Sequence, residues 1–201
     1  MSLRLSGGRK LQSPPGSTAR PTPARVRQAV MNMLSADLPG CSWLDLCCGS
    51  GVMACEAIQR GARRVVAVDQ DRRMAATARS NLSLVAAAQT PPAEVIVVQQ
   101  EVLRWLRQGP AGSEAAWADG SGAGLSGFDL IYADPPYASG LYQQLSEAVA
   151  AGGWLNTGGQ LLLECASSEV PAIAEGWSVL KQKRYGTSTV LILARQDDQA
   201  G

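Results

Sequence analysis

The stretch FDLIYADPPY places a carboxylate, two prolines and an aromatic residue directly after an apolar segment. Asp134 follows the apolar residues 128–133, and Pro135, Pro136 and Tyr137 come next. Each proline fixes its own φ and favours an extended conformation in the residue before it. The corner therefore offers a carboxylate and carbonyl acceptors in fixed positions beside a flat ring. These groups suit a planar ligand that carries an amine, because the acceptors can take its N–H groups while the ring stacks on its face. Taken alone, the motif also fits an ordinary surface turn after a core strand.

A second polar motif lies upstream, in the stretch DLCCGSG at residues 45–51. Its glycines allow the backbone to approach a ligand closely. Asp69 ends the next apolar segment, where a carboxylate can bind both hydroxyls of a ribose. Asp45 precedes the glycines, where it would face a pyrophosphate poorly but suits a cationic amino acid group. A ligand with ribose, adenine and an α-amino group is S-adenosylmethionine, so we expect this cofactor.

The same turn leaves a rival cofactor open. Residues 49–54 satisfy the GxGxxG/A fingerprint of dinucleotide-binding proteins, and Asp69 follows at the spacing expected for NAD. Glu101, at the end of the third expected strand, could accept a hydrogen bond from an adenine amine, or could simply cap the next helix. The expected cofactor-binding residues are Asp45, Cys47, Gly49, Ser50, Gly51, Asp69, Gln70, Glu101 and Val102.

Charge is unevenly distributed along the chain, although the net charge is only +1. All side-chain carboxylates lie from Asp37 onward, whereas the charged side chains of the preceding segment are all basic. A basic arm on a near-neutral body suggests a polyanionic partner, with nucleic acid the first candidate. The alternative is a solvated, disordered N-terminus. The six candidate RNA-binding residues are Arg4, Arg9, Lys10, Arg20, Arg25 and Arg27.

Apolar segments alternate with segments of helical periodicity, which predicts an α/β fold with a doubly wound, Rossmann-like, mostly parallel seven-stranded sheet. A first helix is expected to have its cap at Thr22 and a proline at its first position. The expected strands are 43–48, 64–68, 94–98, 128–133, 159–165, 177–185 and 189–195, the last two joined as an antiparallel hairpin. Further helices are expected over about 52–59, 71–84, 102–106 and 139–151. Ligands of such sheets bind at the carboxyl ends of the strands, where the residues above fall.

The domain organisation follows from composition. We expect a basic N-terminal arm at 1–22, a single domain at 23–195 with a glycine-rich surface insertion at 108–127, and a loose tail at 196–201. The arm should become ordered mainly on contact with a partner. The first turns of the helix after it, with Arg25 and Arg27, should pack on the body and still present charge.

Several classes of function are disfavoured by what the chain lacks. The 201 residues include five cysteines and no histidine, so neither a zinc site, a disulfide framework nor Ser-His or Cys-His catalysis is supported. No apolar run is long enough to span a membrane. We therefore expect a soluble, cytoplasmic monomer that uses no metal.

The motifs together resemble a known family. The stretches DLCCGSG, VDQD and DPPY, in this order, are similar to those of class I methyltransferases that modify exocyclic amines. The stretches LSGG, RKL, RPT and RVR resemble the N-terminus of the bacterial RsmD family, and the resemblance runs from about Leu3 to Arg195. It implies methyl transfer from S-adenosylmethionine to a guanine N2 amine of 16S ribosomal RNA, within a small-subunit ribonucleoprotein particle. The chain departs from the family pattern in a shorter segment after Gly8 and a longer insertion at 108–127.

This resemblance gives the corner a hypothetical chemistry, with Asp134, Pro135, Pro136 and Tyr137 as catalytic residues. An ionised Asp134 only accepts hydrogen bonds, which matches the adjacent N1–H and N2–H₂ donors of guanine. The carbonyl of Pro135 would hold the other N2 proton, and Tyr137 would stack on a base taken out of its helix or loop. An adenine-N6 enzyme of the same fold, an NAD-dependent oxidoreductase and a non-catalytic RNA-binding protein are the alternatives.

Overall fold

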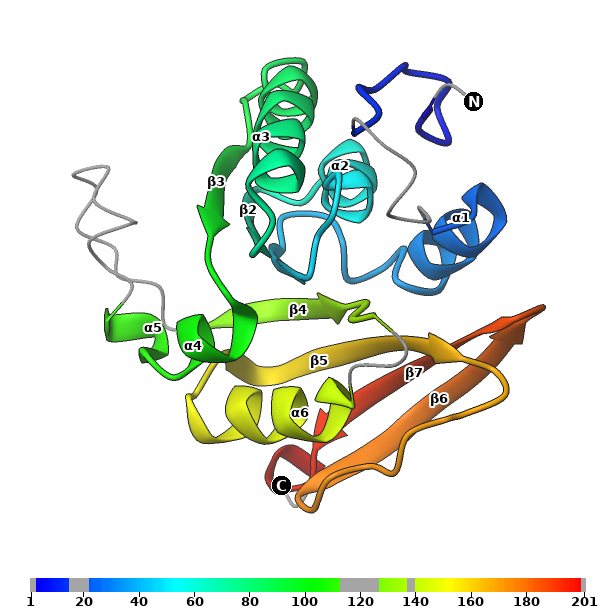
Figure 1. Cartoon of the computed structure of the whole chain (residues 1–201), viewed down its shortest axis with the longest axis vertical. Helices are drawn as coiled ribbons and strands as arrows, with labels where there is room; N and C mark the ends of the chain where they lie inside the picture. The colour runs from blue at the N-terminus through cyan, green and yellow to red at the C-terminus, as the bar shows by residue number, and fades with distance from the viewer. Residues whose placement is uncertain (1–2, 15–21, 113–126, 137–139, 200–201) are drawn as a thin grey trace. The chain divides into compact units, whose positions relative to one another are not determined.

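The computed structural model describes residues 3–14, 22–112, 127–136 and 140–199. These residues form two compact units, Met1–Gln100 and Glu101–Gly201 (Figure 1). Each unit combines strands with helices and has its own buried apolar residues. The division into an arm and one domain at 23–195 remains a prediction.

The first unit is built on three parallel strands with β2 in the middle. They are β1 (Ser42–Leu46), β2 (Arg64–Asp69) and β3 (Glu94–Gln99). Ala67 pairs with Asp45 on one side and with Val97 on the other. The valines of β2 are fully buried, as expected of a parallel strand covered on both faces.

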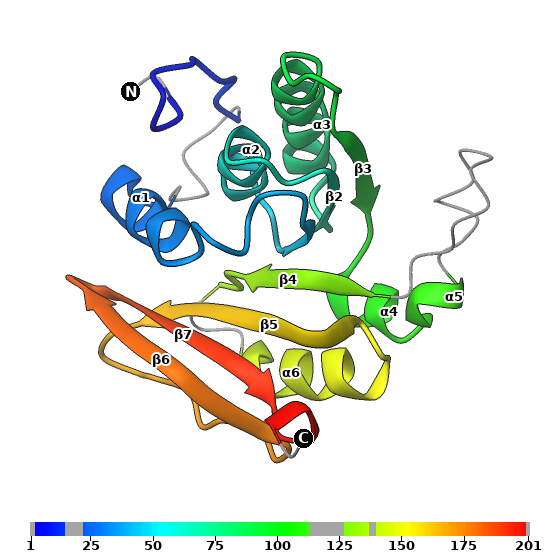
Figure 2. The same cartoon turned by 180° about the vertical axis from the view of Figure 1, so that it is seen from behind.

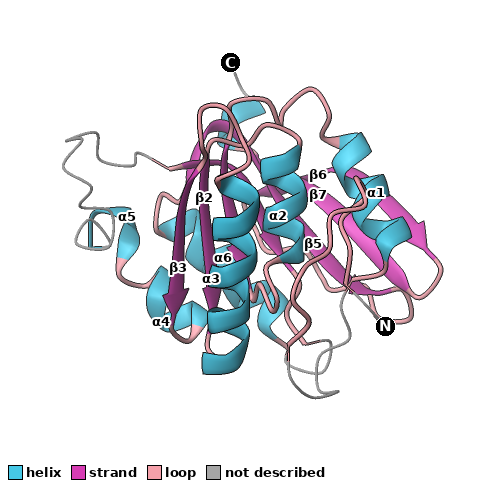
Figure 3. Cartoon of the chain, turned by 90° about the horizontal axis from the view of Figure 1, so that it is seen from above, coloured by secondary structure: helices cyan, strands magenta, loops and turns pink. Residues whose placement is uncertain are grey.

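Three helices belong to this unit: α1 (Ala24–Met33), α2 (Val52–Gln59) and α3 (Arg72–Ala86). Figure 3 shows α2 and α3 side by side over the strands. The carboxylate of Asp71 caps α3 by accepting from the N–H groups of Arg73 and Met74. The expected start of α1 was wrong by one residue. Pro23 has ψ 142°, so it is the extended residue before the helix rather than its first residue.

The second unit holds four strands in the order β4-β5-β7-β6. β4 (Phe128–Ala133) and β5 (Leu155–Ala166) run parallel, and β7 (Ser188–Arg195) is antiparallel to β5. The edge strand is β6 (Trp177–Tyr185), which pairs with β7 in the expected antiparallel hairpin. The helices of the unit are α4 (Val102–Leu106), the single turn α5 (Gly109–Gly112) and α6 (Leu141–Ala151).

Helix α6 covers one face of these four strands (Figure 2). The indole of Trp177 donates to the carbonyl of Ser146, and the guanidinium of Arg195 donates to that of Ala150. Trp177 and Arg195 are paired across β6 and β7, so their side chains lie on the same face. This face of the strands is therefore the one turned toward α6.

In the described part of the chain, helices separate the strands from β1 to β5, whose pairs are parallel, and β6 and β7 follow without a helix and pair antiparallel. The predicted α/β class is confirmed. Within the expected loose tail, Asp197–Gln199 form a 3-10 turn, and Asp198 accepts from the N–H of Gly158 at 3.2 Å. Most of the expected insertion, residues 113–126, lies outside the described residues.

Candidate cofactor and substrate sites

The turn between β1 and α2 contains three residues with positive φ. Cys47 has φ 60°, Gly49 φ 53° and Gly51 φ 72°. A residue other than glycine is uncommon in this conformation, and such backbone strain gathers at functional sites. Cys47 also explains a correction: β1 ends at Leu46 rather than at Cys48, because a residue with positive φ cannot continue a strand.

The two glycines of this turn serve different purposes. A Cβ atom on Gly51 would lie 3.1 Å from the Cβ of Ala78, so this glycine is needed for α3 to pack against the turn. At Gly49, a Cβ atom would meet no described atom within 4 Å. Gly49 therefore presents open backbone, as a ligand-binding turn requires.

Asp69 is fixed by the backbone around it. Its Oδ2 accepts from the N–H of Gly49 at 2.8 Å, and its Oδ1 accepts from the N–H of Asp71 at 2.8 Å. Burial raises the pKa of this carboxyl, and the two N–H groups oppose that effect. Because a carboxylate can accept about four hydrogen bonds, two positions remain for other donors. Asp69 can therefore bind hydroxyl groups without moving.

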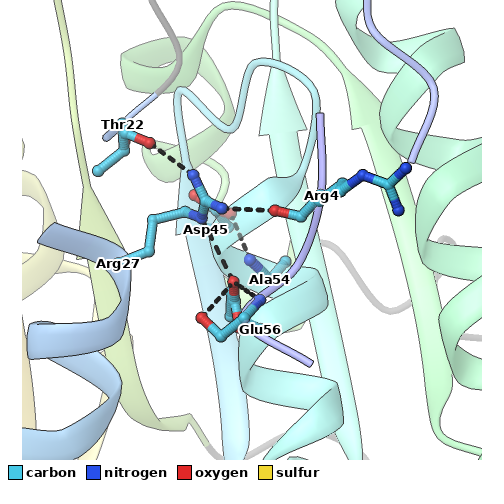
Figure 4. Close-up of polar contacts among 7 residues, drawn as sticks. Arg4, Thr22, Arg27, Asp45, Ala54 and Glu56 are labelled. Carbon is cyan, nitrogen blue, oxygen red and sulfur yellow. Dashed lines mark hydrogen bonds and ion pairs between the residues drawn. The ribbon is translucent and has the colours of Figure 1, made fainter. Parts of the chain in front are cut away.

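Asp45 lies behind the turn, with only 2% of its surface exposed. Its Oδ2 accepts from the N–H of Ala54 at 3.1 Å, in the first turn of α2 (Figure 4). The carboxylate thus orients the helix that follows the turn, and its contact with a cofactor remains a prediction. Beside it, burial and the charges of Asp45 and Asp69 raise the pKa of the Cys48 thiol well above its ordinary value, so this residue is no nucleophile.

Asn81 was missed by the sequence reasoning, although it holds the turn in place. This residue of α3 is fully buried, and its Nδ2 donates to the carbonyl of Ser50 at 3.0 Å. The same amide group bonds Gln12 twice, accepting from its N–H at 2.8 Å and donating to its carbonyl at 3.1 Å. The available signal was a single asparagine at a core position of an amphipathic helix.

Glu101 caps α4 with both carboxylate oxygens. They accept from the N–H groups of Leu103 at 2.9 Å and of Arg104 at 2.8 Å. The alternative role is therefore the one present, and a contact with adenine stays a prediction. Val102 begins α4 and is buried, whereas Gln70 is exposed after β2.

The DPPY corner follows β4 in the second unit. Asp134 is half-buried, Pro135 is buried and Pro136 is exposed, while Tyr137 lies outside the described residues. Asp134 is close enough to Cys165 for its charge to contribute to the raised pKa of that thiol, about 11, after the larger effects of burial and Glu164. The carboxylate therefore lies near the end of β5 as well as of β4.

A buried polar cluster lies beside this corner, and its carboxylate was not among the predicted residues. The hydroxyl of Tyr132 donates a hydrogen bond to Glu164, which also bonds Ser188. Burial raises the pKa of Glu164 despite these hydrogen bonds. A lone acid inside the apolar run LLLECA was the signal in the sequence.

Residues 3–14 of the N-terminal arm pack against the rest of the first unit. Leu5 and Leu11 are buried, and a short antiparallel bridge joins Arg4 to Lys10. The N–H and hydroxyl of Ser6 both donate to Oε1 of Glu56 in α2, at 2.9 and 3.0 Å. The expectation that the arm orders mainly on contact with a partner was wrong for residues 3–14, because these apolar and polar contacts lie within the unit.

Arg27 anchors this arm and does not present its charge (Figure 4). The side chain is buried, and its Nε lies 3.3 Å from Oε1 of Glu56, which is fully buried. Its terminal nitrogens donate to the carbonyls of Thr22 at 2.8 Å and Arg4 at 2.6 Å. The predicted contact of Arg27 with RNA therefore conflicts with its burial, since Nε, Nη1 and Nη2 each donate to an acceptor inside the fold.

The other predicted RNA-binding residues are exposed where they are described: Arg4, Arg9, Lys10 and Arg25. Arg9 donates to the carbonyl of Leu84 at 3.3 Å. Lys10 lines a shallow hollow of about 490 Å³ together with Leu84. Arg20 lies outside the described residues. A role in RNA binding remains a prediction for these five.

The described residues contain no group of three or more His, Cys, Asp or Glu side chains placed to hold a metal ion. None of the described helices is long and apolar enough to cross a membrane.

Known proteins resemble this chain along nearly its whole length. A relative from Haemophilus influenzae, "Ribosomal RNA small subunit methyltransferase D", is 28% identical over 89% of this chain and 84% of its own length. The structure of "Putative methyltransferase yhhF" from Escherichia coli superposes with a TM-score of 0.74 at 23% identity, covering 97% of this chain and 98% of that one. The structure of "SMU.776, a putative methyltransferase complexed with SAH" shows the same fold at a TM-score of 0.63 and 14% identity, over 83% of this chain and 48% of that one.

A family model described as "Conserved hypothetical protein 95" matches residues 5–194. This range includes most of the arm, the glycine turn and the DPPY corner. The chain therefore belongs to this family, the RsmD family.

Proposed function

We propose that this protein is a ribosomal RNA methyltransferase that transfers a methyl group from S-adenosylmethionine to the N2 amine of a guanine in 16S ribosomal RNA. The observation that carries the proposal is the family match, because it covers both the glycine turn and the DPPY corner. The printed name of the Haemophilus relative supports ribosomal RNA of the small subunit as the substrate.

The residues around the glycine turn fit S-adenosylmethionine. Asp69 has acceptor positions left for ribose hydroxyls, and Gly49 offers open backbone beside it. The cofactor supplies a methyl group that is already activated on a sulfonium. The protein therefore needs to orient the acceptor amine and exclude water rather than to provide a strong base.

The substrate base is assigned to the DPPY corner. An ionised Asp134 accepts the N1–H and one N2–H of guanine, and the carbonyl of Pro135 accepts the other N2–H. Both prolines lack an N–H, so no backbone donor competes for these acceptors. Tyr137 stacks on the base after it has left its own stack. The N2 lone pair is then directed toward the methyl group by its two held protons.

Adenine-N6 methylation remains the second candidate, because a DPPY corner is common to amine methyltransferases of both kinds. Adenine offers a donor beside an acceptor on its Watson–Crick edge, and a carboxylate matches only the donor. The carboxylate at position 134 therefore favours guanine. An oxidoreductase would leave both the DPPY corner and the exposed cations of the arm without a purpose.

The test is transfer of labelled methyl from S-adenosylmethionine to small-subunit particles that lack the modification, followed by nucleoside analysis. We expect N2-methylguanosine in the 16S RNA. N6-methyladenosine would retain the cofactor and overturn the assignment of Asp134 to guanine. Absence of cofactor binding in a direct titration would overturn the proposal as a whole.

A further inference from the structure

The edge strand β6 is exposed along most of its length. Residues 179–184 are all exposed, and Val179 and Leu180 expose 46% and 47% of their surface. Its neighbour β7 is buried from Ser188 to Ala194. Figure 2 shows β6 at the outer side of the strands of its unit. One side of β6 is thus paired, and its other side and most of its side chains face solvent.

The charge of this edge has a single sign. The sequence SVLKQKRYG on β6 and its turn contains Lys181, Lys183 and Arg184, and no acidic residue occurs from 176 to 196. Within the described part of the chain, the side chain of neither lysine takes part in a hydrogen bond or an ion pair. Arg184 is partly engaged, since its Nε donates to the carbonyl of Gly186 at 3.1 Å. The two lysines are therefore the cations of the strand whose side chains are available to a partner.

A bulge decides which way these lysines point. Val179 pairs with Leu193, but Lys181 pairs with Ile192, so Leu180 is an extra residue in β6. Side chains alternate between faces along a strand, and the extra residue shifts this alternation by one. Lys181 and Lys183 consequently share a face with Ile192 and Val190, opposite to the face that α6 covers.

That face also carries the polar cluster beside the DPPY corner. Lys183 pairs with Val190, which pairs with Glu164 on β5. Ala133 pairs with Leu163, so Glu164 lies one residue further along, where Asp134 follows on β4. Three inter-strand steps separate β6 from β4, or about 14 Å at the usual spacing. This is too far for contact with the target base, and within reach of phosphates on either side of it.

We propose that Lys181 and Lys183 bind the phosphate backbone of the RNA beside the nucleotide that enters the DPPY corner. The inference rests on the proposed function, because it requires an RNA substrate. It adds a second cationic surface, on the same unit as the corner, to the arm of the first unit. Two aligned cations with no acidic neighbour in their strand match a polyanion, and such contacts position RNA without reading its sequence.

Lysines also occur on edge strands as a protection against unwanted strand pairing. That role requires charge anywhere along the edge, and it does not depend on which face the side chains occupy. It also fits poorly with the exposed Val179 and Leu180 beside them. The placement of both lysines on the face of the corner favours RNA binding.

The experiment measures RNA binding and methyl transfer for the double variant Lys181→Gln with Lys183→Gln. Binding to unmodified small-subunit particles and to protein-free 16S RNA is followed by filter retention between 50 and 300 mM salt, roughly the range in which counterion release is resolved. We expect about tenfold weaker binding and a salt slope reduced by about 1.4 to 1.8, the value for two lost phosphate contacts. At saturating RNA, kcat and cofactor affinity should stay as in the wild type.

Two matched controls accompany it. The Lys181→Arg, Lys183→Arg variant keeps the charge and should bind as the wild type does. The Arg104→Gln, Arg107→Gln variant removes two exposed cations of the same unit, one in α4 and one directly after it, and should also leave the salt slope unchanged. An equal loss in this control would mean a general charge effect and would overturn the proposal.

Other outcomes are equally decisive. Normal binding and slope in the glutamine variant of an active enzyme would overturn the role of the lysines and leave the methyltransferase proposal intact. A wild type that binds RNA but methylates none would overturn the proposed function alone. Sedimentation that shows a dimer formed through β6, broken by the glutamine variant or by a Leu180 substitution, would replace RNA by a second copy of the chain.

Discussion

The charged side chains near the glycine turn and those on β6 differ in what they contact. In the first unit, Asp69 accepts from the N–H groups of Gly49 and Asp71, Asp45 accepts from that of Ala54, and Arg27 donates to two arm carbonyls. In the second unit, the side chains of Lys181 and Lys183 make no hydrogen bond or ion pair with any described residue. The first pattern suits a small ligand that needs a rigid turn, and the second suits a large polyanion that binds by many weak contacts.

The number of cations that are free to bind a partner therefore cannot be derived from the sequence alone. The N-terminal segment has the higher density of basic residues, yet its Arg27 is buried in an ion pair with Glu56. The strand β6 attracts less notice in the sequence, yet both of its lysines are available. Availability depends on burial and partners, which only the fold determines.

The largest expected effect is on stability, and it tests the buried ion pair of Arg27 and Glu56 in the first unit. Arg27→Met leaves the buried Glu56 without its cation, and it should lower the free energy of unfolding by about 3–5 kcal/mol. Urea denaturation followed by circular dichroism measures it. Arg25→Met, an exposed neighbour on the same helix, should change stability by less than about 0.5 kcal/mol. The double variant Arg27→Met, Glu56→Met should recover much of the loss, and equal destabilisation by both single arginine variants would contradict the buried-anchor role.

A second prediction separates chemistry from cofactor binding. Asp134→Ala removes the acceptor for the base and should lower kcat about 10²- to 10³-fold. Its cofactor affinity, measured by calorimetry, should remain within about twofold of wild type because the residue lies outside the glycine turn. Asp129→Asn, at the opposite end of β4, serves as control and should keep its activity. A comparable loss of cofactor affinity in Asp134→Ala would contradict the assignment of the base to the DPPY corner and of the cofactor to the glycine turn.

The converse variant is Asp69→Asn, which keeps size and weakens acceptance of ribose hydroxyls. Cofactor affinity should fall about 10- to 100-fold, the usual worth of hydrogen bonds to a charged group. With saturating cofactor, kcat should be close to normal. Asp71→Asn is the matched control, since asparagine caps a helix as well as aspartate does. Unchanged cofactor affinity in Asp69→Asn would remove this residue from the cofactor site.

The smallest effect concerns Glu164, whose pKa is raised by burial above its ordinary value of 4.5. The folded state then holds the proton more tightly than the unfolded state. This contribution to stability is complete below pH 4.5 and is lost as the pH rises through the raised pKa, with a slope of at most about 1.4 kcal/mol per pH unit. Glu164→Gln should remove that dependence, as thermal melts across pH 4 to 8, roughly the window in which such a carboxyl titrates, would show. Melts with the same pH profile for variant and wild type would mean that Glu164 does not titrate in this range.

Much of the fold could be predicted from the sequence because buried strands appear as short apolar runs and amphipathic helices as apolar residues repeated every three to four positions. The helix 52–59 and the strand 177–185 were placed to the residue. Two errors occurred where a local conformation overrides the pattern: Cys47 ends β1 early by its positive φ, and Pro23 remains outside α1. A third is the start of β5, which was expected at Gly159 and lies at Leu155.

The site was predictable where a residue type is unusual in its position, as for Asp69 after a strand or Asp134 before two prolines. Asn81 and Glu164 were missed, since each acts through a partner that is distant in sequence: Gln12 in one case and Tyr132 in the other. For the same reason Arg27 was misassigned. Its burial depends on Glu56, 29 residues away.

The extra residue in β6 makes the direction of its charges a matter of pairing register rather than of composition. If β6 paired regularly beyond Val179, Leu180 would lie opposite Ile192 and Lys181 opposite Leu191, and both lysines would turn toward the side of α6. Because Leu180 is bulged instead, Lys181 lies opposite Ile192 and Lys183 opposite Val190. Removing Leu180 would take away the bulge and leave these two pairings unchanged. The same cations could therefore face either side of the strand, and the bulge decides between the two.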